Sequence, residues 1–401
     1  MKDAFRRDCL LIPDRFDQAL LKSKQGAFAE VTRRLIKDAE LALLTAPRSV
    51  LEKPILPPSG DRRDYLSLSI YYWPNPSSKD GLPYCYKDGQ VNPESYQTDR
   101  GRFIDMVRDV ESLSIAYAIT RDERFAAHAA RLLHTWFLDE KTGMLPRMLF
   151  AQYIPGDEVA VLWPDYPPRL VPGMDGRKGV YVSFGGVIED LHLVPLTDCI
   201  RLLGASPHWT AAHEAGIKKW YGDYTDWLLT HQHGLDEAAC RNNHGSWYWA
   251  DIACFLEFTG RQQEARDRIA AIFSERLDMQ LEPDGSQPEE LVRAISMNYT
   301  AFGLCSFTNM AVSGQRFGFD AWSAKGSAGR SLRRAVDWFI PYLTGAREWT
   351  WRQIKPFDEI AVIGSLAACA TRFPDGGYED VLRQLPFLPP DHRFRLLYNL
   401  D

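Results

Sequence analysis

The chain has 401 residues, of which 45% are hydrophobic and 25% are charged, a balance that excludes an intrinsically disordered protein. The formal net charge of −6 gives no overall basic field to attract nucleic acid or an anionic membrane, so a polyanionic ligand would need a local basic cleft. No apolar run approaches the roughly 18 residues that a membrane-spanning helix requires.

The chain begins with MKDAFRRDCLLIPDRFDQ, which is too charged for a signal peptide and lacks its long apolar stretch. Either the protein is intracellular or the numbering starts after a removed leader. Apolar residues then recur at three- and four-residue intervals from Gln25 to Ala46. This pattern predicts one amphipathic helix.

Residues 47–99 are rich in proline, glycine, serine and aromatic residues, a composition that cannot sustain a helix. We predict a long ordered loop here. Its aromatic residues are Tyr65, Tyr71, Tyr72, Trp73, Tyr84 and Tyr86. Because such long loops are uncommon in compact domains unless they have a function, we interpret this segment as the wall of a cleft.

Helical patterns then return in pairs separated by turn sequences such as Pro283-Asp284-Gly285. The predicted helices cover residues 102–120, 123–138, 186–203, 208–232, 246–259, 261–280, 289–312, 329–343 and 357–370. Almost no alternating strand pattern appears, and no repeat of fixed length marks a regular solenoid. We therefore predict an all-α fold, a single (α/α) toroid of antiparallel helix pairs with long ordered loops, forming one catalytic domain over residues 1–401.

Cysteine and histidine do not form a metal or redox motif. The seven cysteines are widely spread without a Cys-x-x-Cys pair, so we expect buried free thiols, with one incidental disulfide left open. His231 and His233 lack an accompanying set of ligands such as His-Glu-x-x-His. We predict neither a catalytic metal nor a cofactor.

The densest polar and aromatic cluster is the run Arg241-Asn242-Asn243-His244-Gly245-Ser246-Trp247-Tyr248-Trp249, immediately before a predicted helix. Helix capping accounts for the asparagines as well as a functional role does, because asparagine is a preferred N-cap residue. Capping requires no imidazole, however, and His244 with its aromatic neighbours favours a functional site.

A second cluster, residues 282–289, is a turn leading into a helical pattern that carries Arg293 and Tyr299. On a straight helix these two side chains would be separated by about 120° around the axis. Spacing alone does not bring them together, and each taken singly is ordinarily a solvated arginine or a core tyrosine.

Several motifs in order along the chain resemble the alginate lyase superfamily. They are Asp64-Tyr65-Leu66-Ser67, Tyr71-Tyr72-Trp73-Pro74-Asn75-Pro76, Gly81-Leu82-Pro83-Tyr84, Asp88-Gly89-Gln90-Val91-Asn92-Pro93-Glu94, Thr135-Trp136-Phe137-Leu138-Asp139, Ala151-Gln152-Tyr153-Ile154-Pro155-Gly156, Asn242-Asn243-His244-Gly245-Ser246-Trp247, and Asp284-Gly285-Ser286-Gln287-Pro288 leading to Arg293 and Tyr299. The resemblance extends over well more than half of the chain. The Pro- and Gly-rich residues 157–186 depart from it and are expected to reshape one end of the cleft.

The resemblance implies a polysaccharide lyase that cleaves a 1,4-linked uronic-acid polymer by metal-independent β-elimination. The proton on C5 of a uronate is weakly acidic until the C6 carboxylate is neutralised. By this resemblance Asn243 and Arg293, helped by Asn242 or Gln152, bind the carboxylate and hold the developing charge, since amides and a guanidinium offer donors to oxygen.

The same resemblance assigns proton transfer to Tyr299 and His244. Where the C5 proton and O4 lie on the same side of the sugar, as in mannuronate, Tyr299 could take the proton and return it to O4; where they lie opposite, His244 could be the base and Tyr299 the acid. The sequence does not choose between these roles.

Aromatic side chains are expected to stack on sugar rings, although each could equally be an ordinary core aromatic. The candidates are Tyr72, Trp73, Trp247 and Trp351. The expected partner is an anionic polysaccharide, either alginate, preferably of the mannuronate type, or glucuronan. The resemblance favours a secreted or periplasmic protein, while a cytoplasmic location and the oligomeric state stay open.

A glycoside hydrolase on an (α/α) toroid is the nearest alternative and would need paired carboxylates across the scissile bond. Asp284, Glu289 and Glu290 are available, but Glu289 and Glu290 are neighbours on a helix and point apart. A non-catalytic polyuronate-binding protein is the other alternative, and it would have no need of a base.

Overall fold

The computed structural model describes residues 10–156, 169–171, 180–182, 184–385 and 388–400. Its α-helices are α1 (Pro13–Lys24), α2 (Ala29–Ala42), α3 (Asp99–Thr120), α4 (Glu123–Leu133), α5 (Val194–Leu203), α6 (Ala211–Thr230), α7 (Gln232–Ala239), α8 (Asn243–Phe258), α9 (Gln262–Gln280), α10 (Pro288–Leu291), α11 (Ser296–Arg316), α12 (Leu332–Leu343), α13 (Ile360–Arg372), α14 (Tyr378–Gln384) and α15 (Phe394–Leu397). Shorter helical segments are η1 (Val50–Glu52), η2 (Pro93–Gln97), η3 (His134–Leu138), η4 (Phe184–Leu193), η5 (Ser327–Gly329) and η6 (Pro374–Gly376). The predicted all-α toroid is confirmed.

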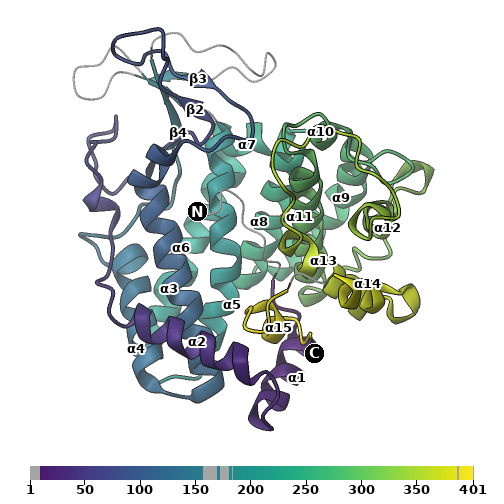
Figure 1. The fold of residues 1–401 in the computed structure, drawn as a ribbon. Coiled ribbons are helices and arrows are strands. Elements are labelled where there is room, and N and C mark those ends of the chain that lie inside the picture. Colours follow the sequence, from purple (N-terminus) through teal and green to yellow (C-terminus); the bar gives the residue numbers. More distant parts are fainter. Residues whose placement is uncertain (1–9, 157–168, 172–179, 183, 386–387, 401) are drawn as a thin grey trace.

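Helix α11 lies at the centre of the C-terminal half of the toroid. Between Ser296 and Gly314 every residue except Asn298 is buried, as expected for a helix surrounded by protein on all sides. It packs against α8 and α13, while α3 plays a similar part in the N-terminal half, against α2, α4 and α5 (Figure 1). Helices α1 and α15, the first and last of the described helices, pack against each other.

Several predicted helix boundaries are wrong, and two of these errors affect the fold most. The single helix predicted from Gln25 to Ala46 is the shorter α2, and α1 precedes it in a stretch that the sequence left unassigned. The helix predicted over residues 289–312 is interrupted at residues 292–295, between α10 and α11. Arg293 lies within this interruption and Tyr299 lies near the start of α11, so the interruption changes their relative geometry, as described below.

Short strands add a small sheet that the sequence did not predict. They are β1 (Leu66–Leu68), β2 (Tyr72–Trp73), β3 (Cys85–Tyr86), β4 (Phe150–Pro155), β5 (Arg169–Val171) and β6 (Val180–Val182). The sheet order is β1-β4-β6-β5, with β1 parallel to β4, and β2 pairs separately with β3. Figure 1 shows β2, β3 and β4 together at one end of the helices. Five of these strands have only two or three residues, too few to display an alternating pattern, and the six-residue β4 has buried residues on both faces.

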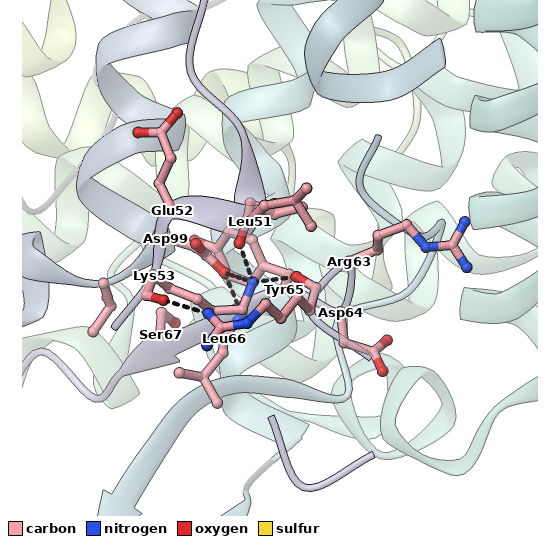
Figure 2. Close-up of polar contacts among 12 residues, drawn as sticks. Leu51, Glu52, Lys53, Arg63, Asp64, Tyr65, Leu66, Ser67 and Asp99 are labelled. Carbon is pink, nitrogen blue, oxygen red and sulfur yellow. Dashed lines mark hydrogen bonds and ion pairs between the residues drawn. The ribbon is translucent and has the colours of Figure 1, made fainter. Parts of the chain in front are cut away.

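The segment 47–99 is anchored by a buried ion pair (Figure 2). The ammonium of Lys53 lies 2.8 Å from the Asp99 carboxylate, and both side chains are 0% exposed. Lys53 also donates to the Arg62 carbonyl at 2.6 Å, and the Leu66 amide donates to Asp99 at 2.9 Å. Burial raises the pKa of Asp99 to about 6 and lowers that of Lys53, with each charge partly offsetting the effect on the other. The pair fixes the start of β1 against the first turn of α3.

A second buried network of hydrogen bonds joins the β1 region to η4 and α3. Tyr65 and Ser67 both donate to one carboxylate oxygen of Glu189 on η4, at 2.6 and 2.8 Å, and Arg100 on α3 donates to the other at 3.1 Å. The predicted loop is therefore ordered, as expected. It also contains short strands and is held to α3 and η4 by buried polar contacts.

The described cysteines are all free thiols, as the sequence analysis expected for most of them. Among the helices of the described residues, none is both long and apolar enough to cross a membrane. Most of the segment 157–186, which we expected to reshape the cleft, lies outside the described residues.

Candidate active site

The Asn-Asn-His cluster forms the first turn of α8. Asn242 is the N-cap: its side-chain oxygen accepts the His244 backbone N–H at 3.1 Å. The preceding turn is held by buried Arg276, which donates to the Cys240 carbonyl at 2.6 Å. A side chain on Gly245 would meet that carbonyl at 2.2 Å, so glycine is required for this approach. Capping is thus a real role of Asn242, and it leaves His244 and Asn243 to be explained.

His244 is paired with a buried carboxylate. Its Nδ1 lies 2.7 Å from Glu237 of α7, whose side chain is 1% exposed, while the imidazole is 23% exposed. Burial raises the pKa of Glu237, and His244 partly counteracts this. Because a carboxylate at Nδ1 favours a proton there, the lone pair of a neutral ring is placed on Nε2. That is the arrangement of a general base.

Asn243 is held by Glu290 of α10. Its backbone N–H donates to one carboxylate oxygen at 2.7 Å, and its side-chain amide donates to the other at 2.8 Å. Glu290 is 1% exposed, and burial raises its pKa against the opposing influence of Arg293, Asn243 and His244. The Asn243 side-chain oxygen is buried without a hydrogen-bond partner. Both Arg293 and His244 therefore lie close enough to act on the carboxyl group that orients Asn243.

Arg293 and Tyr299 converge because Arg293 lies in the helix interruption at residues 292–295, before α11 begins. The Arg293 guanidinium lies 3.6 Å from the centroid of the Tyr299 ring, and its Nη2 donates to the tyrosine hydroxyl at 2.6 Å. Tyr299 is 4% exposed. Burial raises the pKa of Tyr299 well above its ordinary value, with Arg293 acting in the opposite direction. The phenol is therefore protonated in the resting protein near neutral pH.

The 47–99 segment completes this part of the site. Tyr71 accepts a hydrogen bond from the Tyr299 hydroxyl at 2.9 Å. Asp88 accepts two bonds from Arg293, at 3.2 and 2.6 Å, and one from the Ala294 backbone N–H at 2.8 Å. The segment predicted as a cleft wall thus contributes directly to the surroundings of Tyr299.

Gln152 lies on β4, apart from this hydrogen-bonded group. Its φ of 51° is in the left-handed region, which is uncommon for a residue other than glycine. Its backbone N–H donates to Ser67 at 2.8 Å, and its side-chain oxygen accepts a long bond from Ser69 at 3.4 Å. These hydrogen bonds join β4 to β1 and the residue that follows it, and they do not involve the catalytic candidates.

The aromatic candidates differ sharply in exposure. Trp247 is 0% exposed and packs against Phe302, so our expectation that it stacks on a sugar is wrong for this structure. Tyr72 is 7% exposed and packs against Tyr86. A helical aromatic close to a functional motif faces the core as readily as the solvent, and the sequence did not distinguish the two.

Trp73 and Trp351 are partly exposed and remain candidates for stacking on a sugar ring. The Trp73 indole donates to the Gln90 carbonyl at 2.8 Å, and the Lys87 ammonium lies 5.0 Å from the ring centroid. Trp351 belongs to a half-buried aromatic cluster with Trp338, Tyr342 and Trp349. The Trp349 indole donates to Ser296 at 2.9 Å, which joins this cluster to the first turn of α11.

Sequence reasoning missed Glu237, Asp88 and Tyr71 as contributors, and it considered Glu290 only as a hydrolase carboxylate. The motifs that contain Asp88 and Tyr71 were a usable signal, but their partners lie more than 200 residues further along the chain. Glu237 carried no signal, because it precedes His244 across a helix break. Within the described residues no group of three or more His, Cys, Asp or Glu side chains could hold a metal ion.

A helical toroid with a tyrosine, arginine, asparagine and histidine in such a site defines a polysaccharide lyase. The alginate lyase family model matches residues 49–349, and the chain belongs to the alginate lyase family. The resemblance on which the sequence analysis relied is therefore confirmed. A comparison with curated protein sequences gave no match.

Solved structures agree. The crystal structure of an alginate lyase from Bacteroides ovatus matches with a TM-score of 0.88 and 32% identity, covering 98% of each chain. Alginate lyase A1-III from Sphingomonas species A1 matches with a TM-score of 0.51 and 16% identity, over 91% of this chain and 94% of that one. A variant of A1-III complexed with a tetrasaccharide has a TM-score of 0.52 and 14% identity, over 91% of this chain and 94% of that one. At these low identities the A1-III structures show a shared fold.

Proposed function

We propose that the protein cleaves a 1,4-linked polyuronate by β-elimination, with alginate of the mannuronate type as the preferred substrate and glucuronan as the other candidate. The observation that carries this proposal is the contact of Arg293 with Tyr299, because it combines a carboxylate-binding group with a proton-transfer group. The names of the family and of the Bacteroides ovatus relative support alginate.

In the proposed reaction the C5–H bond of the uronate breaks and its proton passes to a base. The electron pair forms the C4=C5 double bond, the C4–O4 bond breaks, and O4 receives a proton from an acid. Atoms and electrons balance without water, an oxidant or a metal. The products are a new non-reducing end with an unsaturated uronate and a shortened polymer.

Arg293 and Asn243 are proposed to receive the C6 carboxylate. Negative charge grows on this group as the C5 proton leaves, so donors aimed at it stabilise the transition state more than the ground state. Glu290 fixes the amide of Asn243, and Asp88 fixes the guanidinium of Arg293. Both donors are thus oriented before the substrate arrives, which lowers the reorganisation needed during the reaction.

Tyr299 and His244 are proposed to exchange the protons. Tyr299 starts protonated and is ready to donate to O4, while His244, oriented by Glu237, presents Nε2 as a base for a substrate whose C5 proton lies on the opposite side. For mannuronate, whose C5 proton and O4 lie on the same side, Tyr299 would first lose its proton to solvent, then take the C5 proton as a phenolate and return it to O4.

Of the three carboxylates considered for a hydrolase, two are engaged in other hydrogen bonds and the third is exposed. Glu290 holds Asn243, Asp284 accepts bonds from the backbone and side chain of Ser286, and Glu289 is exposed on α10. This arrangement favours elimination over hydrolysis.

The test is to incubate the purified protein and its Tyr299→Phe variant, with a chelator present, against polymannuronate, polyguluronate and glucuronan. The readout is the ultraviolet absorbance of the unsaturated uronate. We expect a rise with one polymer that is lost in the variant. New reducing ends without absorbance would indicate hydrolysis, and binding without turnover would indicate a non-catalytic polyuronate-binding protein; either result would refute the proposal.

A further inference from the structure

The guanidinium of Arg293 joins the Tyr299 hydroxyl to the Asp88 carboxylate. One side of its guanidinium contacts the Tyr299 hydroxyl, and the Asp88 carboxylate binds Nε and Nη2. The Nη2 atom is common to both contacts. Any change in the position or charge of Asp88 is therefore transmitted to Tyr299 through a single guanidinium.

Asp88 also fixes the backbone at the helix interruption. The carboxylate oxygen that accepts from Arg293 Nε also accepts the Ala294 N–H at 2.8 Å. The main chain of the neighbouring Gly89 is tied down by Lys355, which donates to its carbonyl. Asp88 thus binds the side chain and the following backbone of the same interruption, and a bidentate pair of this kind restricts an arginine to one orientation.

The charges that face the Tyr299 hydroxyl come from several elements. Arg293 precedes α11, Asp88 and Tyr71 belong to the 47–99 segment, and Tyr86 on β3 lies near both Arg293 and Asp88. Glu290 on α10 is the next charged group beyond Arg293. Among these groups, Arg293 favours the phenolate form of Tyr299, while Tyr71 and Asp88 oppose it.

Asp88 is ionised in the resting protein. Burial acts to raise its pKa, but the hydrogen bonds and charge of Arg293 outweigh burial, and the pKa lies below its ordinary value. The ionised carboxylate cancels much of the arginine's charge at the phenol. Tyr299 therefore keeps its proton more firmly than it would beside an uncompensated arginine.

We propose that Asp88 is a positioning residue that holds Arg293 over Tyr299 and sets, through the arginine, the pH at which Tyr299 exchanges its proton. This inference rests on the proposed function, because it requires Tyr299 to take part in proton transfer. Asp88 itself touches neither substrate nor reacting atoms in this scheme; its effect passes entirely through Arg293.

The test compares the pH dependence of kcat/KM for the wild type, Asp88→Asn, Asp88→Glu and Asp109→Asn across the pH range in which all remain folded. The asparagine variant removes the charge and keeps the shape. Asp109 provides a matched control, since it pairs with Arg48 at 2.6 Å and its side chain is 18% exposed, as is that of Asp88, but it lies on α3.

We expect the Asp88→Asn profile to move toward lower pH by roughly one unit, because a carboxylate close to the phenol no longer opposes its ionisation. The direction is the same whether Tyr299 acts as base or as acid. Asp88→Glu should keep the wild-type position even if its rate is lower, and Asp109→Asn should match the wild type.

An unmoved Asp88→Asn profile, a move toward higher pH, or an equal displacement in Asp88→Glu would each overturn the inference. The Tyr299→Phe variant separates this failure from that of the proposed function. If it is inactive while Asp88→Asn is not displaced, only the role of Asp88 is refuted; if it keeps full activity, the role of Tyr299 and the inference fall together.

Discussion

The Nη2 atom of Arg293 donates to the Tyr299 hydroxyl at 2.6 Å while the guanidinium lies 3.6 Å from the centre of the same ring. A helix interruption makes both contacts possible, since an unbroken helix would direct the side chains about 120° apart. The arginine therefore acts on the hydroxyl both as a donor and as a charge.

Replacing Arg293 by lysine should lower kcat by about 100- to 1000-fold, the usual cost of removing a donor aimed at a developing negative charge. Lysine keeps the positive charge but loses the fork that joins Asp88 and Tyr299. Steady-state kinetics on the preferred polymer would measure the loss. Arg316→Lys is the control, because Arg316 is similarly buried and paired with Asp198 at 2.9 Å, yet lies at the far end of α11. Equal losses in the two variants would contradict a specific role for Arg293.

Replacing Glu237 by glutamine should lower kcat by about 100-fold without abolishing substrate binding, because His244 loses the carboxylate that fixes its tautomer. Asp236→Asn, at the adjacent position on α7, should leave kcat unchanged. Kinetics with polyguluronate and polymannuronate would show whether His244 acts on one substrate only. A Glu237→Gln enzyme with wild-type kcat on both polymers would remove His244 from the mechanism.

The buried carboxyl groups of Asp190 and Asp251 should make the fold less stable as pH rises. Burial raises the pKa of Asp190 to about 7 and that of Asp251 well above its ordinary value, and the two carboxyl groups lie close enough to influence each other. The unfolded chain releases these protons near pH 3.9. Between about pH 4 and 7 the folded protein thus holds more protons than the unfolded one, so the free energy of unfolding falls with rising pH.

Asp251→Asn should flatten this dependence, since an amide can donate to Asp190 without a titrating proton. Thermal unfolding across that pH window measures the slope, and Asp223→Asn, on the exposed face of α6, serves as the control. A slope that is the same in all three proteins would mean that other groups dominate.

Replacing Lys53 by methionine should reduce the free energy of unfolding by about 3–5 kcal/mol, because the Asp99 carboxylate would be left buried without its cation. Lys219→Met removes an ion pair of similar length, 2.6 Å, from a surface where the side chains are 74% and 47% exposed. It should cost no more than about 1 kcal/mol. Urea unfolding would compare them, and similar midpoints would show that the buried pair contributes little.

Trp351→Ala should raise KM for the polymer by up to about tenfold with little change in kcat, if this ring stacks on a sugar away from the reacting bond. Trp227→Ala is the control, because Trp227 on α6 is also partly exposed but stacks on His231, the residue that follows α6. An unchanged KM would assign Trp351 to packing within its aromatic cluster alone.

Helical periodicity and turn residues were sufficient to predict most of the helices, because those signals act between near neighbours in the chain. The same reasoning predicted α8 but began it at Ser246, three residues after its start at Asn243, and it left capping by Asn242 as one of two interpretations. It failed at residues 292–295, where apolar residues continue but the helical backbone does not. It also failed at the sheet, because most of its strands have two or three residues and the longer β4 has buried residues on both faces.

The residue types at the candidate site were visible in the sequence as ordered motifs, and their chemistry follows from the side chains themselves. Only the tertiary structure decided which of them meet: Asp88 reaches Arg293, Tyr71 reaches Tyr299, and Glu237 reaches His244. It also decided that Trp247 faces the core. Such pairings depend on how distant helices and loops pack together, and nothing in the local spacing of residues along one segment encodes them.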